Sequence, residues 1–169
     1  MGSGITGLST AIHLQQAMPR KHVVVFERGM LPYGASTRNA GFTCFGSMGE
    51  LVSDLQHHSE DEVLKLVEMR VKGLELLKKL VNPKFMQHQS VGNYELFTPA
   101  EKVQFQNLAS QIPAINKLLH PIFKQEVFAV VEKSFGFAGA NQYIHNRFEG
   151  MINSGSMMSG LLERAHRLG

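Results

Sequence analysis

Apolar residues recur every three or four positions along several stretches of the chain, and this spacing predicts amphipathic helices. One of these stretches follows Ser59, whose spacing from Glu62 is that of a capping box. Another follows Thr98 and Pro99, which suit the cap and the first position of a helix. The predicted helices cover residues 4–18, 48–57, 59–79, 99–119 and 155–168.

Short apolar runs between these helices predict strands. Residues 22–27 (HVVVFE) are rich in β-branched side chains, and such a run is typical of a strand buried on both faces of a parallel sheet. Further strands are predicted over residues 92–97, 127–131 and 142–147. Residues 28–46 are instead punctuated by Gly, Pro, Ser and Asn, which favour a loop. Together the elements predict a protein of the α/β class.

Composition narrows the class of protein. The 169 residues suit one domain, or one domain and a part of another. A hydrophobic share of 43% is enough for a sizeable core and excludes general disorder. Seventeen Lys and Arg against fourteen Asp and Glu give a net charge of +3, and the basic residues are scattered. A nucleic-acid partner is therefore not expected.

Cysteine, histidine and apolar runs exclude other kinds of site. Cys44 is the only cysteine, which excludes a disulfide framework and a cysteine-rich metal site. The eight histidines form no pair at a metal-binding spacing, so no metal is expected. No apolar run reaches the roughly 18 residues of a membrane span, and no signal peptide is recognisable. We therefore expect a cytoplasmic protein without a transmembrane segment.

A glycine motif opens the first predicted helix. Gly2, Gly4 and Gly7 have the G-x-G-x-x-G spacing that lets backbone amides at a helix start approach a pyrophosphate. Glu27 closes the next apolar run, twenty residues after Gly7, where a carboxylate accepts hydrogen bonds from a ribose. The alternative is a glycine-rich turn before an ordinary helix, with Glu27 at a solvated strand end. The pattern favours a dinucleotide site, although only Met1 stands where a preceding strand is expected.

Residues 27–41 (ERGMLPYGASTRNAG), with the upstream GSGITGLSTAIHL, resemble the D-amino acid oxidase-like superfamily of FAD-dependent oxidoreductases. This superfamily includes glycine and sarcosine oxidases and D-amino acid dehydrogenases. Residues 149–169 are similar to the segment where such chains return from the substrate domain to the flavin domain. The resemblance implies a partial Rossmann-like FAD-binding domain without its first strand, joined to part of an α+β substrate domain.

The resemblance also implies three sets of contacts to FAD. One set wraps the pyrophosphate and consists of Gly2, Ser3, Gly4, Ile5, Thr6 and Gly7, with Ser36 and Thr37 reaching it from the loop at residues 28–46, called the second loop below. Another set flanks the adenosine ribose and consists of Glu27 and Arg28. The last set brings backbone against the isoalloxazine ring and consists of Asn39, Ala40 and Gly41.

The implied domains divide the chain into four segments. Residues 1–48 belong to the FAD-binding domain, 49–84 form helices packed on it, 85–147 belong to the substrate domain and 148–169 return to the FAD-binding domain. The implied reaction is oxidation of the C–N bond of an amino acid or related amine by hydride transfer to flavin. The catalytic residues stay unknown, because spacing does not distinguish Tyr94, Tyr143 and His145 from structural side chains.

Two other functions share part of this pattern. An NAD-binding dehydrogenase half would explain residues 2–27 but not GASTRNAG, and a non-catalytic nucleotide-binding module would explain the fold without redox chemistry. We also expect the chain to be an N-terminal fragment that lacks its C-terminal half. Because a missing central strand removes burial comparable with the stability of a whole domain, we expect the isolated chain to be unstable and to bind FAD weakly or not at all.

Overall fold

The computed structural model describes residues 2–133, 135–140 and 142–169. The chain forms two compact units. Unit 1 consists of Met1–Thr43, Leu74–Gln89 and Met151–Gly169, and unit 2 consists of Cys44–Gly73 and Ser90–Gly150. The boundaries of the FAD-binding and substrate domains stay predictions.

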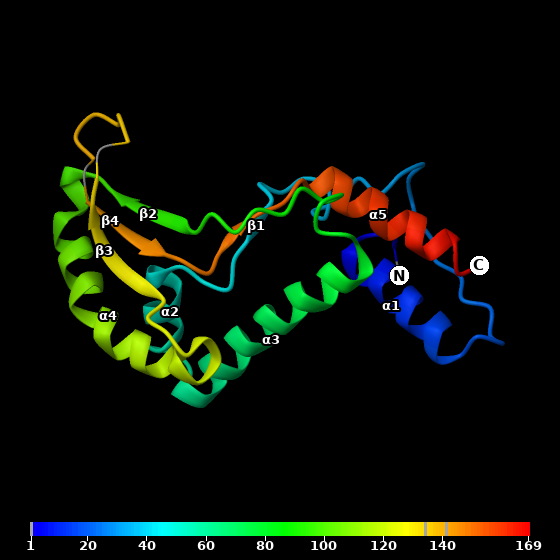
Figure 1. Cartoon of the computed structure of the whole chain (residues 1–169), viewed down its shortest axis with the longest axis horizontal. Helices are drawn as coiled ribbons and strands as arrows, with labels where there is room; N and C mark the ends of the chain where they lie inside the picture. Colours follow the sequence, from blue (N-terminus) through cyan, green and yellow to red (C-terminus); the bar gives the residue numbers. More distant parts are fainter. Residues whose placement is uncertain (1, 134, 141) are drawn as a thin grey trace. The chain divides into compact units, whose positions relative to one another are not determined.

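Two helices from opposite ends of the sequence form the core of unit 1. Helix α1 (Ile5–Ala17) and helix α5 (Ser154–His166) lie side by side (Figure 1). Small side chains let α1 approach its neighbours closely, since Gly7 and Ala11 are both buried. The buried apolar core consists of Leu8, Ile12, Val81, Met86, Met157, Met158 and Leu161.

Unit 2 contains an antiparallel sheet with the strand order β2-β4-β3. Its strands are β2 (Asn93–Phe97), β3 (Phe128–Glu132) and β4 (Gln142–Asn146). Helix α4 (Lys102–Phe123) packs against this sheet (Figure 1). The alternation of the strands directs one set of side chains at the helix. The buried core therefore includes Phe97, Phe128 and Ile144 from the sheet and Phe105, Leu108, Ile115 and Leu119 from α4.

Three helices begin at side-chain capping boxes. Helix α3 (Glu60–Leu80) follows the predicted capping box, in which the Ser59 amide donates to Glu62 Oε2 at 2.9 Å. The predicted Thr98 cap is confirmed at the single-turn helix η1 (Pro99–Glu101), which leads into α4. Helix α2 (Met48–Asp54) begins with a third box, formed by Ser47 and Glu50. Strands β1 (Phe42–Thr43) and β5 (Gly150–Met151) form a two-stranded sheet.

The predicted strand at residues 22–27 is wrong. The segment carries no strand assignment, and in the described part of the chain the backbone of Val23–Phe26 makes no hydrogen bond. It is not buried on both faces either, because Val24 is 68% and Phe26 77% exposed. A strand is defined by its pairing, and the described residues supply no partner strand here. The other predicted helices and strands are confirmed to within a few residues.

Candidate functional site

The glycine turn leaves free donors at the start of α1. Gly4 is the N-cap residue, with extended backbone and no capping side chain of its own. The Ile5 amide donates to Ser36 Oγ at 3.0 Å. Among the described residues, the amides of Thr6 and Gly7 have no hydrogen-bond partner. Free N–H groups at a helix start carry partial positive charge, so the turn can bind an anionic group.

Glu27 lies against the same turn. Its Oε2 accepts hydrogen bonds from the Ser3 amide at 2.8 Å and from Ser3 Oγ at 2.7 Å. Its Oε1 accepts from the Gly29 amide at 3.1 Å. The Ser3 hydroxyl, followed by the Ser3 and Gly29 amides, lowers the pKa of Glu27 from 4.5 to about 2. Glu27 is therefore an anionic acceptor at neutral pH. It contacts Ser3 although 24 positions separate the two residues in sequence.

The remaining turn residues are close to these groups. A Cβ on Gly2 would lie 3.3 Å from Glu27 Oε2, and one on Gly4 would lie 3.0 Å from Ser36 Oγ. Larger residues at both positions would therefore crowd the polar side chains that the turn gathers. Arg28 is exposed, and its guanidinium has no partner within the described residues.

The second loop makes most of its polar contacts within itself. Thr37 Oγ1 lies 3.1 Å from the Pro32 carbonyl and 3.1 Å from the Gly34 carbonyl, so its hydroxyl is directed into the loop. Asn39 Nδ2 donates to backbone carbonyls of the same loop. Ala40 is exposed, whereas Gly41 is buried with a positive φ of 77°. Of the predicted loop residues, the structure brings only Ser36 to the glycine turn.

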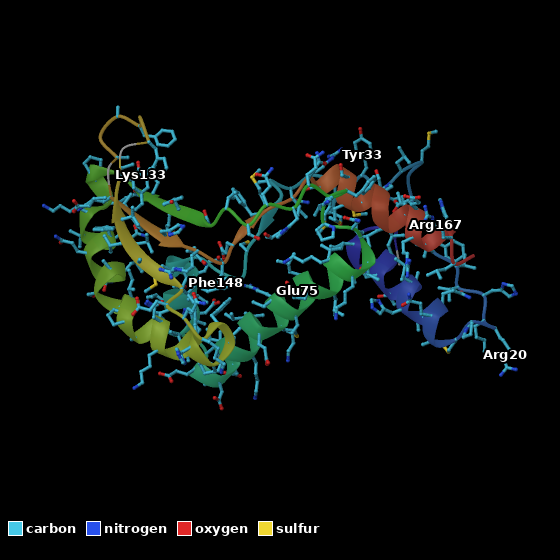
Figure 2. All side chains as sticks on the ribbon, in the orientation of Figure 1. Arg20, Tyr33, Glu75, Lys133, Phe148 and Arg167 are labelled. Carbon is cyan, nitrogen blue, oxygen red and sulfur yellow. The ribbon has the colours of Figure 1, made fainter. Side chains whose placement is uncertain are left out.

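A largely apolar cavity of about 560 Å³ opens beside Glu27 in unit 1. It lies between α1, α5 and residues 23–32, and its polar lining includes Ser3 and Glu27. A second cavity of about 450 Å³ lies between the loop and α5. There Arg38 stacks over the Tyr33 ring at 4.6 Å from its centroid. Figure 2 shows Tyr33 beside α5.

Unit 2 contains all three of the side chains that the sequence left unassigned. Tyr143 is buried and donates from its hydroxyl to the Ala140 carbonyl at 2.8 Å, which is a structural contact. Tyr94 stacks on His145 with ring centroids 4.4 Å apart. Burial, followed by the charge of Arg147, lowers the pKa of His145.

Sequence reasoning missed a buried carboxylate in unit 2. Glu149 is 1% exposed and accepts hydrogen bonds from the Phe45 amide at 2.9 Å, the Gly46 amide at 3.2 Å and Asn93 Nδ2 at 3.0 Å. It fixes the last residues of the second loop, and no local spacing reveals it because its backbone amide partners are 103 and 104 residues away. Cys44 is exposed as a residue, but partial desolvation of its sulfur, followed by the charge of Glu149, raises the pKa of the thiol.

Two classes of feature are not found in the described residues. They contain no group of three His, Cys, Asp or Glu side chains that could hold a metal ion. None of the helices that the structure describes is both long and apolar enough to span a membrane.

Free amides, an anionic acceptor and a small-residue turn at one helix start are features typical of dinucleotide-binding sites. A family model described as "FAD dependent oxidoreductase" (DAO) matches residues 1–169, so the chain belongs to this family. FAD is the cofactor of the family, and the site fits it, because the Thr6 and Gly7 amides and Glu27 supply the donors and the acceptor that a pyrophosphate and a ribose require.

Two solved structures show the same fold. Glycine oxidase from Geobacillus kaustophilus matches with a TM-score of 0.63 and 17% identity, and glycine oxidase from Bacillus cereus ATCC 14579 with 0.60 and 14%. Each match covers 99% of this chain and 43% of the oxidase, so the chain spans less than half the length of these proteins. The fold is therefore a mixed arrangement of helices and strands like that of the matching part of these two oxidases. No curated protein matches the chain.

Proposed function

We propose that this chain provides the FAD-binding part of an oxidoreductase that oxidises the C–N bond of an amino acid or related amine. The observation that carries the proposal is the contact between Glu27 and Ser3, which places an anionic acceptor beside the free amides of Thr6 and Gly7. Membership of the FAD-dependent family and the likeness to two proteins named as glycine oxidases support it.

The residues of the turn would bind and orient the cofactor. The Thr6 and Gly7 amides would donate to the pyrophosphate, and Glu27 would accept from the ribose hydroxyls, with Arg28 beside it. A carboxylate at this position would also repel a 2′-phosphate, which disfavours NADP. FAD held by these residues would supply the hydride acceptor for oxidation of the substrate C–N bond.

The second loop would contribute to FAD binding mainly through the shape of its backbone. Ser36 is held at the start of α1, where its hydroxyl would lie close to the pyrophosphate. The backbone of Asn39, Ala40 and Gly41 would face the isoalloxazine ring, because small residues approach a flat ring without collision. The hydroxyl of Thr37 is already used inside the loop, so its contribution to pyrophosphate binding would come through the loop's conformation.

Flavin content and substrate reduction test the proposal. The purified full protein should show the visible absorption of a flavin and release FAD on denaturation. Under anaerobic conditions glycine, sarcosine or a D-amino acid should bleach that absorption, whereas the corresponding 2-hydroxy acids should not. Glu27→Ala should lower the affinity for FAD, and Glu60→Ala, at an exposed position of α3, serves as the matched control. A protein that retains a nicotinamide cofactor, or a flavin that no amine reduces, would contradict the proposal.

A further inference from the structure

We propose that Ser154 and Asn39 form a clasp that fixes the second loop for FAD, which makes Ser154 a positioning residue of the site. The two side chains meet although 115 positions separate them in sequence. The inference rests on the proposed function, because it takes residues 39–41 to be the part of the loop that faces the flavin ring. It adds a residue from α5, which the glycine motif and the loop do not include.

The carboxamide of Asn39 is the centre of the clasp. Its Oδ1 accepts hydrogen bonds from Ser154 Oγ at 2.6 Å and from the Gly41 amide at 2.9 Å. Its Nδ2 donates to the Ala35 and Ser36 carbonyls, both at 3.0 Å. Two donor hydrogens and two acceptor lone pairs are the full capacity of a carboxamide. The side chain of Asn39 is therefore committed to shaping the loop and has no group left for a ligand.

Gly41 contacts residues 152–154, the segment that contains Ser154. The Ile152 amide donates to the Gly41 carbonyl at 2.8 Å, two residues before Ser154. A Cβ on Gly41 would lie only 2.2 Å from the Ile152 carbonyl oxygen, and φ at Gly41 is +77°. Both the close approach and the left-handed backbone require glycine. Residues 152–154 thus hold residues 39–41 of the loop through a backbone contact and a side-chain contact.

The hydroxyl of Ser154 is not needed by its own helix. Ser154 is the first residue of α5 and is 9% exposed. The cap of α5 comes from Asn153, whose side chain accepts from the Ser156 amide at 2.9 Å. A capping role does not account for the direction of the Ser154 hydroxyl, because that hydroxyl donates to the loop. Its role is therefore to position the loop.

Variants of both clasp residues test the inference in the full protein. Ser154→Ala should weaken FAD binding about 2- to 10-fold, the effect of one lost hydrogen bond, and should shift the visible band of bound flavin. It should also speed hydrogen exchange at the Ile152 amide in the absence of FAD. Adding Ser154→Ala to Asn39→Ala should cause no further loss, because the clasp is already broken. The matched control is Ser156→Ala, whose hydroxyl takes no part in the clasp.

The outcomes separate this inference from the proposed function. If the unchanged protein binds FAD and Ser154→Ala binds it with the same Kd and the same flavin band, the clasp has no positioning role. If the unchanged protein binds no FAD, the proposed function fails and this inference fails with it. Should Ser154→Ala not fold, Asn39→Ala gives the deciding measurement, since Asn39 is exposed. An unchanged Kd and band in that variant would overturn the inference.

Discussion

Two pentapeptides of nearly the same composition have different structures in the two units. Residues 23–27 (VVVFE) in unit 1 and 128–132 (FAVVE) in unit 2 both combine valines with one phenylalanine and end in glutamate. The second is strand β3, paired along its length with β4. The first makes no backbone hydrogen bond in the described part of the chain. Local propensity favours a strand in both, but among the residues that the structure describes only the second pentapeptide has a neighbouring strand.

Burial follows the pairing. Phe128 is 2% exposed because the sheet presents it to α4, whereas Phe26 is 77% exposed. Unpaired N–H and C=O groups beside exposed apolar side chains make residues 23–26 a place where another strand can add. Whether such a segment forms a strand and buries its side chains therefore depends on a partner strand and a covering helix. Without them, the same side chains contribute little to stability.

Amide hydrogen exchange should show the largest difference between the two segments. Amides of β3 and β4 that bond to each other open only with the sheet, so we expect protection about 10³-fold or more above that of Val23–Phe26. The exchange rates of the two segments, measured residue by residue in one sample, give this ratio directly. The Ile144 amide is a useful internal reference, because its residue is buried in the central strand. Equal protection of both segments would show that residues 23–26 are paired in solution.

The fold could be predicted from the sequence wherever the signal is local. The capping box at Ser59 and Glu62 and the Pro99 helix start involve residues within three positions of each other, and both are confirmed. The strand at residues 22–27 could not be judged in this way, because its formation depends on a partner strand. The order β2-β4-β3 likewise required contacts between distant residues.

The candidate site, like the fold, could be predicted where its signal is local and not where it depends on distant residues. The glycine turn and Glu27 were predicted from spacing, and the structure brings Glu27 to Ser3. Ser154 and Glu149 were not assigned roles, since Asn39 lies 115 residues from Ser154 and the partners of Glu149 lie 56 to 104 residues away, with no characteristic spacing. Loop residues were predicted as cofactor contacts from resemblance, Thr37 at the pyrophosphate and the backbone of Asn39 at the flavin ring. In the structure the Thr37 hydroxyl is used inside the loop, and the Asn39 side chain bonds to the loop and to Ser154.

Truncation of the two phenylalanines should give the next largest difference. Phe128→Ala removes a buried ring from the core of unit 2 and should lower the free energy of unfolding by about 3–5 kcal/mol. Phe26→Ala removes an exposed ring and should change it by less than about 0.5 kcal/mol. Urea unfolding of both variants, followed by circular dichroism, measures the two values. A cost for Phe26→Ala that approaches that of Phe128→Ala would mean that the ring is buried in solution.

The smallest expected effect concerns two carboxylates, one in each unit. Glu27 is exposed, and the Ser3 hydroxyl and amide lower its pKa to about 2. Glu95, in unit 2, accepts from the Gly49 amide at 3.4 Å, but burial raises the pKa of its carboxyl. Because the Glu27 pKa is below its ordinary value of 4.5, its contacts stabilise the fold above that pH and are lost as the pH falls from 4.5 towards 2. On acidification Glu95 should therefore take up its proton before Glu27.

A carboxyl-carbon NMR titration of the unchanged chain measures both groups. Ser3→Ala removes the hydroxyl that is the main cause of the low value, so the pKa of Glu27 should rise while that of Glu95 stays unchanged. Ser9→Ala, also on the N-terminal side of α1, is the matched control because its side chain makes no contact with Glu27. If Glu27 titrates at 4.5 in the unchanged chain, its bonds to Ser3 do not persist in solution. The acceptor would then not be held at the helix start, and the geometry on which the proposed FAD binding rests would be absent.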